Sequence, residues 1–117
     1  MSLELVSTQE QWQAICALDD LIPDSGICTL VGDQQVAIFY LPSETPAIYA
    51  VSNWDPIGEA NVMSRGIVGS IGDELVVASP LYKQHFSLAT GQCLEQPEHS
   101  LRSYSIRLES ATVEINV

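Results

Sequence analysis

The chain after residue 26 is a succession of short apolar runs separated by turn residues. The runs 27–31 and 36–40 are rich in β-branched and aromatic residues, and Gly32-Asp33 between them is typical of a tight turn. A third run of the same kind covers residues 47–51. This pattern predicts a β-hairpin followed by a third strand.

The second half of the chain continues the extended pattern after a long, glycine-containing connection. Four further strands are expected, over residues 66–70, 75–78, 103–108 and 112–117. A second hairpin is expected around a turn at 89–91, with arms at 82–88 and 92–94. The last two runs alternate apolar with polar residues, which is typical of half-buried strands at the edge of a sheet. These elements predict an all-β fold, a small sandwich or barrel.

The N-terminal segment has a different pattern, with apolar residues at helical spacing. Ser7 and Glu10 stand in the Ser-x-x-Glu arrangement of a capping box, and three apolar residues follow, Trp12, Ile15 and Cys16. We therefore expect a short helix over about 8–18. No repeat divides the remainder, so residues 1–117 are interpreted as a single domain with its β part over about 26–117.

The charge balance limits the partners that the protein can have. Fifteen acidic and four basic residues give a net charge of −11 over 117 residues. Binding to nucleic acids and to anionic membranes depends on lysine and arginine, so neither partner is expected. A partner protein with a basic surface suits this charge better.

The cysteines and the lack of long apolar segments indicate a compartment. Cys16, Cys28 and Cys93 are odd in number and far apart, which argues against a disulfide framework. We interpret them as small buried hydrophobic residues in a reducing environment. No segment is long and apolar enough to span a bilayer, and the first residues do not resemble a secretory signal, so a cytoplasmic location is expected.

Two segments resemble the cluster-binding loops of Rieske iron–sulfur domains. Residues 79–94 are similar to the second loop, which reads Cys-Pro-x-His and then reaches a Phe and a Thr-Gly turn. Residues 53–58 follow a predicted strand and are placed like the first loop, Cys-x-His followed by a glycine. The resemblance extends over residues 26–117 and implies a Rieske-like fold.

All four cluster ligands of the Rieske pattern are replaced in this sequence. The resemblance places the two cysteine ligands at Asn53 and Ser79, and the two histidine ligands at Asp55 and Tyr82. A Rieske cluster needs two thiolates and two imidazoles, which these four residues do not supply. We therefore expect no cluster, no other metal and no cofactor on this chain, and we assign no catalytic residue.

A Rieske-like chain without ligands, with Trp12 in an N-terminal segment and a lengthened segment between its two loops, resembles one family. That family is the small subunit of the cytoplasmic, assimilatory NAD(P)H-dependent nitrite reductase. The resemblance implies a non-catalytic accessory subunit that docks on a large subunit. That large subunit is expected to carry FAD, the NAD(P)H site, sirohaem and an iron–sulfur cluster, and to reduce nitrite to ammonium. An autonomous Rieske-like redox carrier and a stand-alone protein-binding module remain the alternatives.

The tips of the two loops form the candidate partner-binding surface. Three apolar residues are expected at its centre, Trp54, Ile57 and Leu81. A polar rim is expected around them, formed by Asp55, Glu59 and Lys83. In the alternative interpretation, Trp54 and Leu81 fill the space beneath the loops and take no part in binding.

Other residues that suggest chemistry have simpler interpretations. His85 stands alone in an extended run, which favours an exposed or hydrogen-bonded strand histidine. The glycine-rich residues 66–72 are not followed by a helical pattern, so they offer no helix N-terminus for a phosphate. The spacing of the acidic residues near Pro23 does not match a calcium loop and favours a solvated corner.

Overall fold

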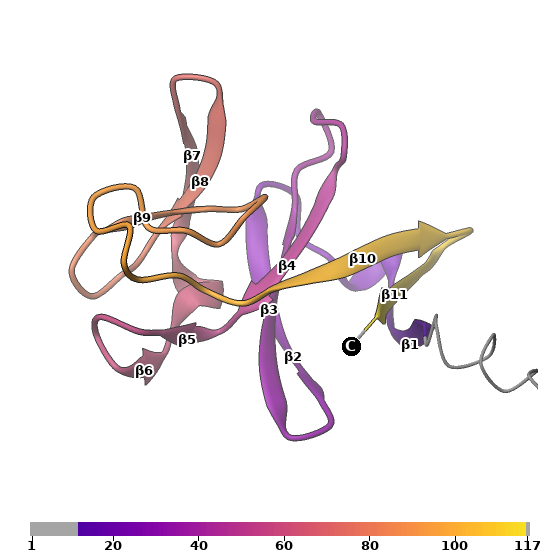
Figure 1. The fold of residues 1–117 in the computed structure, drawn as a ribbon. Coiled ribbons are helices and arrows are strands. Elements are labelled where there is room, and N and C mark those ends of the chain that lie inside the picture. Colours follow the sequence, from indigo (N-terminus) through magenta and orange to yellow (C-terminus); the bar gives the residue numbers. More distant parts are fainter. Residues whose placement is uncertain (1–11, 117) are drawn as a thin grey trace, which may run out of the picture.

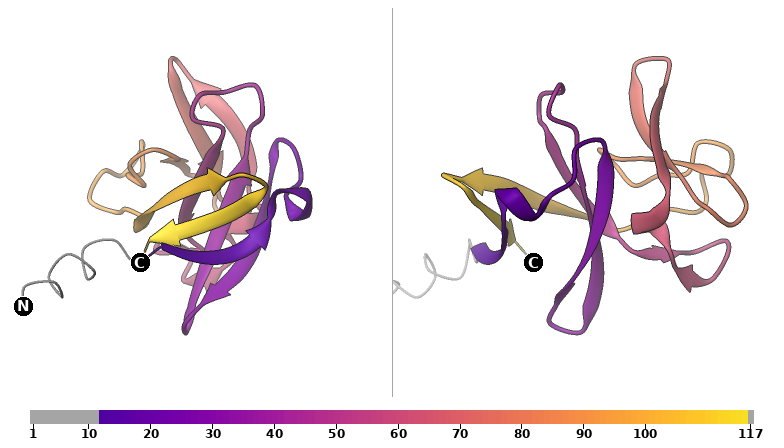
Figure 2. Two further views of the ribbon diagram at one scale, coloured as in Figure 1. Left: turned by 90° about the vertical axis from the view of Figure 1, so that its right-hand side faces the viewer. Right: turned by 180° about the vertical axis from the view of Figure 1, so that it is seen from behind.

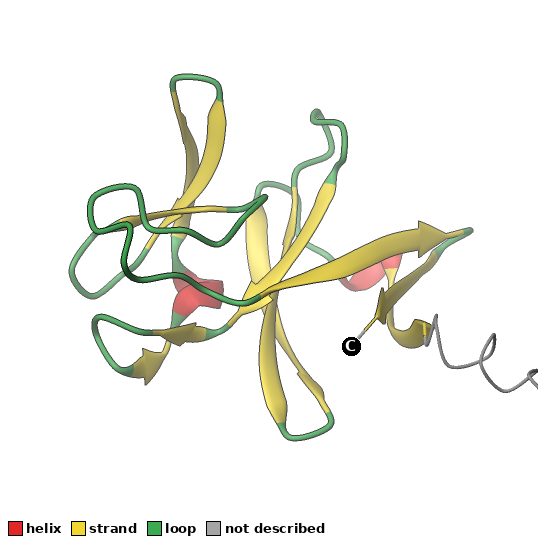
Figure 3. Ribbon diagram, viewed as in Figure 1, coloured by secondary structure: helices red, strands yellow, loops and turns green. Residues whose placement is uncertain are grey.

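A curled antiparallel sheet forms the larger part of the fold (Figures 1 and 3). The computed structural model describes residues 12–116. The sheet has six strands, in the spatial order β1 (Trp12–Ala17), β11 (Thr112–Asn116), β10 (Ser103–Glu109), β4 (Ile48–Ser52), β3 (Gln34–Tyr40) and β2 (Ser25–Val31). Two further views make the curl of this sheet visible (Figure 2). The predicted all-β fold is confirmed.

A second, smaller group of strands follows β4 and carries the two loops of interest. It comprises the pair β5 (Trp54–Asp55) and β6 (Ala60–Asn61), and a sheet of β7 (Ile67–Ile71), β8 (Glu74–Ala78) and β9 (His85–Ser87), in that order. Two short 3-10 helices complete the described elements, η1 (Leu18–Asp20) and η2 (Met63–Arg65). Within residues 12–116, no helix is long and apolar enough to cross a membrane.

β3 is buried on both faces, which explains its continuous apolar sequence. Ala37 and Phe39 belong to a first core that they form with residues of β8, β9 and η2. Val36 and Ile38 belong to a second core, together with residues of β4 and β11. Strands that are covered on both faces have apolar runs rather than alternation. The predicted hairpin of β2 and β3 and the strand β4 after it are confirmed.

The strands predicted in the second half are present, although the second hairpin is short. β7 and β8 pair in regular antiparallel register around a turn at Gly72. The hairpin predicted around residues 89–91 keeps one bridge, between Phe86 and Cys93, and Gly91 at its turn has a positive φ of 85°. Glycine adopts this backbone conformation without steric cost.

The predicted N-terminal helix is wrong over the residues that the structure describes. Residues 12–17 form β1, which pairs with β11, and residues 8–11 lie outside the described part of the chain. The register of β1 shifts between Ala14 and Cys16. A β-bulge of this kind breaks strict alternation. Ile15 and Cys16 are therefore both half-buried, which produced the helix-like spacing.

The prediction that the last two strands occupy sheet edges is also wrong. β11 pairs with both β1 and β10, and β10 pairs in turn with β4. Val113 and Ile115 of β11 are buried while their neighbours are half-buried. Alternation of apolar and polar residues therefore shows only that one face of a strand is covered. It does not distinguish an edge strand from an interior strand, because either can have one covered face. β1, which the sequence pattern did not predict, supplies the edge.

The three cysteines differ in environment, which corrects the prediction that all are buried. Cys93 is buried in the first core, Cys16 is half-buried and Cys28 is exposed on β2. Partial burial raises the pKa of the Cys28 thiol, and burial together with the charge of Asp20 raises the pKa of the Cys16 thiol. All three are free thiols.

Candidate functional site

The two loops that resemble Rieske cluster loops meet beside the small sheet. The first loop runs from Asn53 through β5 and β6, and the second connects β8 to β9 over residues 79–84 (Figure 1). A side-chain hydrogen bond joins them, because Ser79 Oγ donates to Asp55 Oδ2 over 2.5 Å. The topology therefore brings together two positions that are 24 residues apart in the sequence.

Asp55 is the centre of this junction. Its side chain is fully buried, and its Oδ1 accepts hydrogen bonds from the backbone N–H groups of Ile57 at 2.8 Å and Gly58 at 3.0 Å. The Ser79 hydroxyl, also buried, accepts a bond from the backbone N–H of Leu81 at 3.2 Å. Both carboxylate oxygens thus have donors, as a buried carboxylate requires. One aspartate fixes the turn of the first loop and ties it to the second.

Asn53 makes a different set of contacts, although it is also buried. Its Nδ2 donates to Gln35 Oε1 at 3.0 Å and lies 3.5 Å from Cys28 Sγ, and its Oδ1 accepts from the backbone N–H of Ser64 at 2.7 Å. These partners belong to the β2–β3 hairpin and to η2. Asn53 therefore anchors the first loop to the large sheet and takes no part in the junction between the loops.

Tyr82 is the most exposed of the four former ligand positions. Its exposed fraction is 64%, against 2% or less for the other three. The four side chains consequently do not converge as ligands of one group would. Asp55 and Ser79 are hydrogen-bonded to each other, Asn53 contacts other elements, and Tyr82 lies on the surface.

The residues at these positions do not fit a [2Fe–2S] cluster. They include neither a thiolate nor an imidazole, the two ligand types of a Rieske centre. Asp55, the carboxylate among them, already uses both oxygens for hydrogen bonds within the loops. The described part of the chain also contains no group of three or more His, Cys, Asp and Glu side chains that could hold a metal ion.

The predicted docking residues lie at the loop tips with different degrees of exposure. Trp54 is 45% exposed and Leu81 is 43% exposed, whereas Ile57 is half-buried against the first core. Lys83 is exposed and has a positive φ of 66°. The expectation that Asp55 belongs to the polar rim is wrong, because this residue is fully buried.

Leu81 also covers the junction between the loops. A Cβ atom placed on Gly58 would lie 2.4 Å from Leu81 Cδ1 and 3.0 Å from Asp55 Oδ2. Glycine at this position therefore allows the Leu81 side chain to rest on the first loop, over the bond between Asp55 and Ser79. Leu81 therefore fills space between the loops while part of its side chain stays exposed, and its role in binding remains a prediction.

His85 contacts the carboxylate of Glu95 at the base of the second loop. Its Nδ1 lies 2.6 Å from Glu95 Oε2, and its backbone N–H donates to Glu95 Oε1 at 2.8 Å. Desolvation acts to raise the pKa of Glu95, but the hydrogen bonds from His85 outweigh it, so the pKa of Glu95 lies below its usual range. The interpretation of His85 as a hydrogen-bonded strand residue is confirmed.

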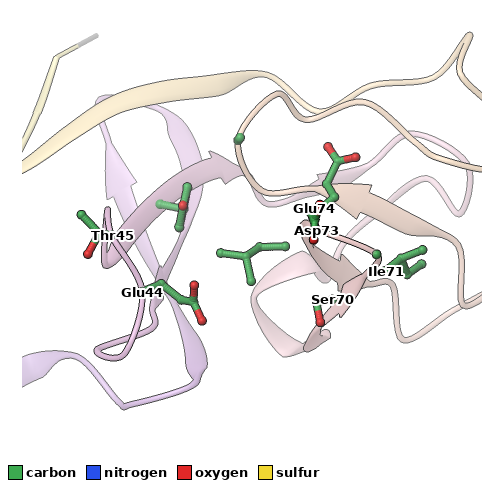
Figure 4. A pocket seen from close by; sticks show the side chains of 10 residues that line it. Glu44, Thr45, Ser70, Ile71, Asp73 and Glu74 are labelled. Atoms are coloured by element: carbon green, nitrogen blue, oxygen red, sulfur yellow. The ribbon is translucent and has the colours of Figure 1, made fainter.

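A groove that the sequence did not predict lies between the β3–β4 loop and the β7–β8 hairpin (Figure 4). It has a volume of about 750 Å³. Its walls carry the carboxylates of Glu44, Asp73 and Glu74. Its lining also includes Tyr49 and Leu75, which pack against the first core. The walls are about 30 residues apart in the sequence, so no local pattern could have joined them.

Comparisons with known proteins support the Rieske-like fold and identify the family within it. The family of Rieske-like [2Fe-2S] domains matches residues 11–116. The nitrite reductase (NADH) small subunit of Escherichia coli K12 is 44% identical over 105 residues, which cover 90% of this chain and 96% of that protein. The solution structure of the Escherichia coli protein NirD has a TM-score of 0.83 and 42% identity, covering 93% of this chain and 98% of that one.

A related segment also occurs inside a much longer protein. The nitrite reductase [NAD(P)H] large subunit of Klebsiella oxytoca is 39% identical over 102 residues, which cover 87% of this chain and 10% of that protein. Full-length similarity to small subunits, a matching Rieske-like domain and loops without cluster ligands all agree. The chain belongs to the Rieske-like [2Fe-2S] domain family and, within it, to the small subunits of NAD(P)H-dependent nitrite reductase.

Proposed function

We propose that this protein is the non-catalytic accessory small subunit of an NAD(P)H-dependent nitrite reductase, and that it docks on the large subunit that reduces nitrite to ammonium in nitrate assimilation. The observation that carries the proposal is the 44% identity to a nitrite reductase small subunit over 96% of its length. The loops agree with it, because they present hydrogen-bonded side chains where an electron carrier of this fold would hold its cluster.

The related segment in the Klebsiella oxytoca protein supports physical association with the large subunit. There, a segment 39% identical to this chain is part of one polypeptide named as the large subunit. Covalent linkage holds two domains at a high effective concentration, so even a weak contact between them is kept. A separate chain needs an interface of its own to reach the same arrangement. We therefore expect such an interface on the present protein.

The redox chemistry is assigned to the partner because the side chains described here do not suit it. Reduction of nitrite by a nicotinamide cofactor needs groups that accept and pass electrons, which are supplied by flavins, haems and iron–sulfur clusters. We expect FAD, the NAD(P)H site, sirohaem and an iron–sulfur cluster on the large subunit. The part of this chain is then to complete or stabilise the complex.

The loop tips are the proposed docking surface. Trp54, Ile57 and Leu81 provide apolar area, Lys83 provides a charge at the rim, and the bond between Asp55 and Ser79 holds the tips in place without a ligand. Exposed tryptophan is among the residues that most often dominate the binding energy of an interface. A rigid surface also loses little conformational freedom on binding.

Binding of Trp54→Ala protein to the purified large subunit tests this surface. We expect the affinity to fall about 30-fold, the equivalent of about 2 kcal/mol for a central aromatic residue. Leu30→Ala is the matched control, because Leu30 is 65% exposed on β2 of the large sheet. The control should change affinity by less than about threefold, which is within the range expected of a peripheral residue.

Two results would contradict the proposed docking surface. In the first, Trp54→Ala protein binds as well as the wild type. In the second, the variant loses more than about 2 kcal/mol of unfolding free energy, as expected on truncating a packed core residue.

Iron analysis and a visible spectrum of anaerobically purified protein test the alternative function, an autonomous redox carrier. Two irons per chain with a Rieske-type spectrum would replace the accessory role with electron transfer.

A further inference from the structure

We propose that the groove between the β3–β4 loop and the β7–β8 hairpin binds an extended segment of the large subunit that carries lysine or arginine, and that this segment pairs with the free edge of β7. The inference rests on the proposed function, because it names the part of the same partner that a second surface would receive. Three observations carry it: the negative charge of the groove, the unpaired edge of β7, of which Ser70 and Ile71 line the groove, and the apolar floor of the groove.

The charge of the groove is uniformly negative. Glu44 lies on one wall, and Asp73 and Glu74 lie on the other (Figure 4). A neighbouring depression of about 230 Å³ shares Glu44 with the groove and adds Asp24. No Lys, Arg or His side chain lines either hollow, and among the described residues no ion pair neutralises these carboxylates. A hollow lined by one sign of charge concentrates the potential and selects a cationic occupant.

The second property is the unpaired edge of β7. This strand pairs with β8 on one side, and no strand within residues 12–116 pairs with its other side. Alternate residues of an antiparallel strand direct their backbone N–H and C=O groups away from the partner strand. β7 therefore offers a row of donors and acceptors, the arrangement to which extended peptides add as a further strand.

The sequence of β7 does not protect this edge. Natural edge strands are commonly blunted by lysine, proline or a bulge, which prevent pairing with other chains. The strand Ile67–Ile71 carries no charge and no proline, and its register with β8 is regular over all five residues. Ile67 is 74% exposed and Ile71 is 44% exposed. An unprotected edge with exposed isoleucines is what a strand-addition site requires.

The third property is the apolar floor of the groove. Leu75 and Tyr49 are half-buried and packed against the first core, so they offer apolar surface at a fixed position. An extended segment directs alternate side chains to opposite sides. One set of its side chains can cover this floor while basic side chains reach the carboxylates on the walls. The occupant is therefore a strand of mixed apolar and basic residues.

The test compares charge removal in the groove with the same charge removal elsewhere. The groove variant carries Glu44→Gln, Asp73→Asn and Glu74→Gln, and the control variant carries Asp19→Asn, Asp33→Asn and Glu98→Gln. All six side chains are exposed, and both variants lose three negative charges. Affinity for the purified large subunit is measured at several salt concentrations, and the melting temperature is used to confirm that both variants fold.

We expect the groove variant to bind about 10- to 100-fold more weakly than the wild type at low salt, and the control to change by less than about threefold. The difference should shrink as salt rises, because ions screen exposed charges. Equal affinities for the two variants would overturn the inference. The proposed function fails in a different way, since wild-type protein would then not bind the large subunit at any salt concentration.

Hydrogen exchange tests the pairing of β7 directly. Amides of Ile67–Ile71 that point away from β8 should exchange rapidly in the free protein and become protected in the complex. The outward amides of β2, an edge strand of the large sheet, are the internal control and should not change. If binding leaves the exchange of the β7 amides unchanged, strand addition is wrong.

Discussion

The loop junction and the groove use the same functional group in opposite ways. At the junction, the carboxylate of Asp55 is fully buried and accepts three hydrogen bonds. In the groove, the carboxylates of Glu44, Asp73 and Glu74 are exposed and have no ion-pair partner among the described residues. A buried carboxylate is retained only with its donors in place, whereas an exposed one remains available to a partner. The Asp55 carboxylate therefore stabilises the fold, whereas the groove carboxylates are available to the basic segment proposed above.

The largest difference between the two regions should appear on replacing one carboxylate from each. Asp55→Ala leaves two amides and the Ser79 hydroxyl without their acceptor in a buried place, so we expect a loss of about 3 kcal/mol of unfolding free energy. Asp73→Ala at an exposed turn should stay within about 0.5 kcal/mol. Urea unfolding measures both. Equal losses of unfolding free energy in the two variants would contradict the difference drawn between the junction and the groove.

Replacement of Asn53 asks whether the first loop depends on more than its junction with the second. Asn53→Ala removes the acceptor of the Ser64 amide and the donor to Gln35, so a loss of about 2 kcal/mol is expected. The same urea experiment, with the Asp55→Ala and Asn53→Ala double variant added, measures their coupling. Because the two side chains have separate partners, we expect the losses to add within about 0.5 kcal/mol. A large departure from additivity would show that Asn53 and Asp55 belong to one hydrogen-bond network rather than anchoring the first loop independently.

Two glycines sharpen the comparison through packing. Gly58→Ala places a Cβ against Leu81 and Asp55, so we expect a loss of about 1 kcal/mol. Gly69→Ala on β7 meets open space and should change stability by less than about 0.5 kcal/mol. Thermal unfolding compares the two. Leu81→Ala removes the 2.4 Å contact with Leu81 Cδ1. If Gly58→Ala costs as much in the Leu81→Ala protein as in the wild type, Leu81 is not what Gly58 accommodates.

Glu95 lies between the two extremes, because its side chain is half exposed and accepts hydrogen bonds from His85. Hydrogen bonds from His85 hold its pKa below the ordinary value, so this pair stabilises the fold above about pH 4.3 and ceases to do so as the pH falls through the lowered pKa. Glu95→Gln should cost less than about 1 kcal/mol at pH 7, as exposed ion pairs do. The gap between variant and wild type should close on acidification, and a gap independent of pH would contradict the ionic origin.

The extended elements were predictable because their patterns are local. The run 36–40 has a continuous apolar sequence because both faces of β3 are covered, and the turn at Gly32-Asp33 follows from its residue types. Ligand loss at Asn53, Asp55, Ser79 and Tyr82 could likewise be seen from the resemblance alone. These features depend on short stretches of chain, in which residue type and spacing carry the information.

The remainder depends on contacts between distant segments. β1 resembled a helix because a bulge between Ala14 and Cys16 broke its alternation, and the pairing with β11 that decides its structure lies about 100 residues away. The burial of Asp55 was missed for a similar reason, since its partner Ser79 is 24 residues further along the chain. Tertiary pairing overrides a local pattern in such cases.

The bond between Asp55 and Ser79 also makes the loop tips independent of electron flow. A Rieske cluster holds the same two loops with iron, whose charge changes each time an electron arrives or leaves. A carboxylate and a hydroxyl do not change oxidation state under these conditions. The hydrogen bond between them forms without iron and is not damaged by oxygen. On the docking surface proposed above, this bond would keep one constant face toward the large subunit throughout the catalytic cycle.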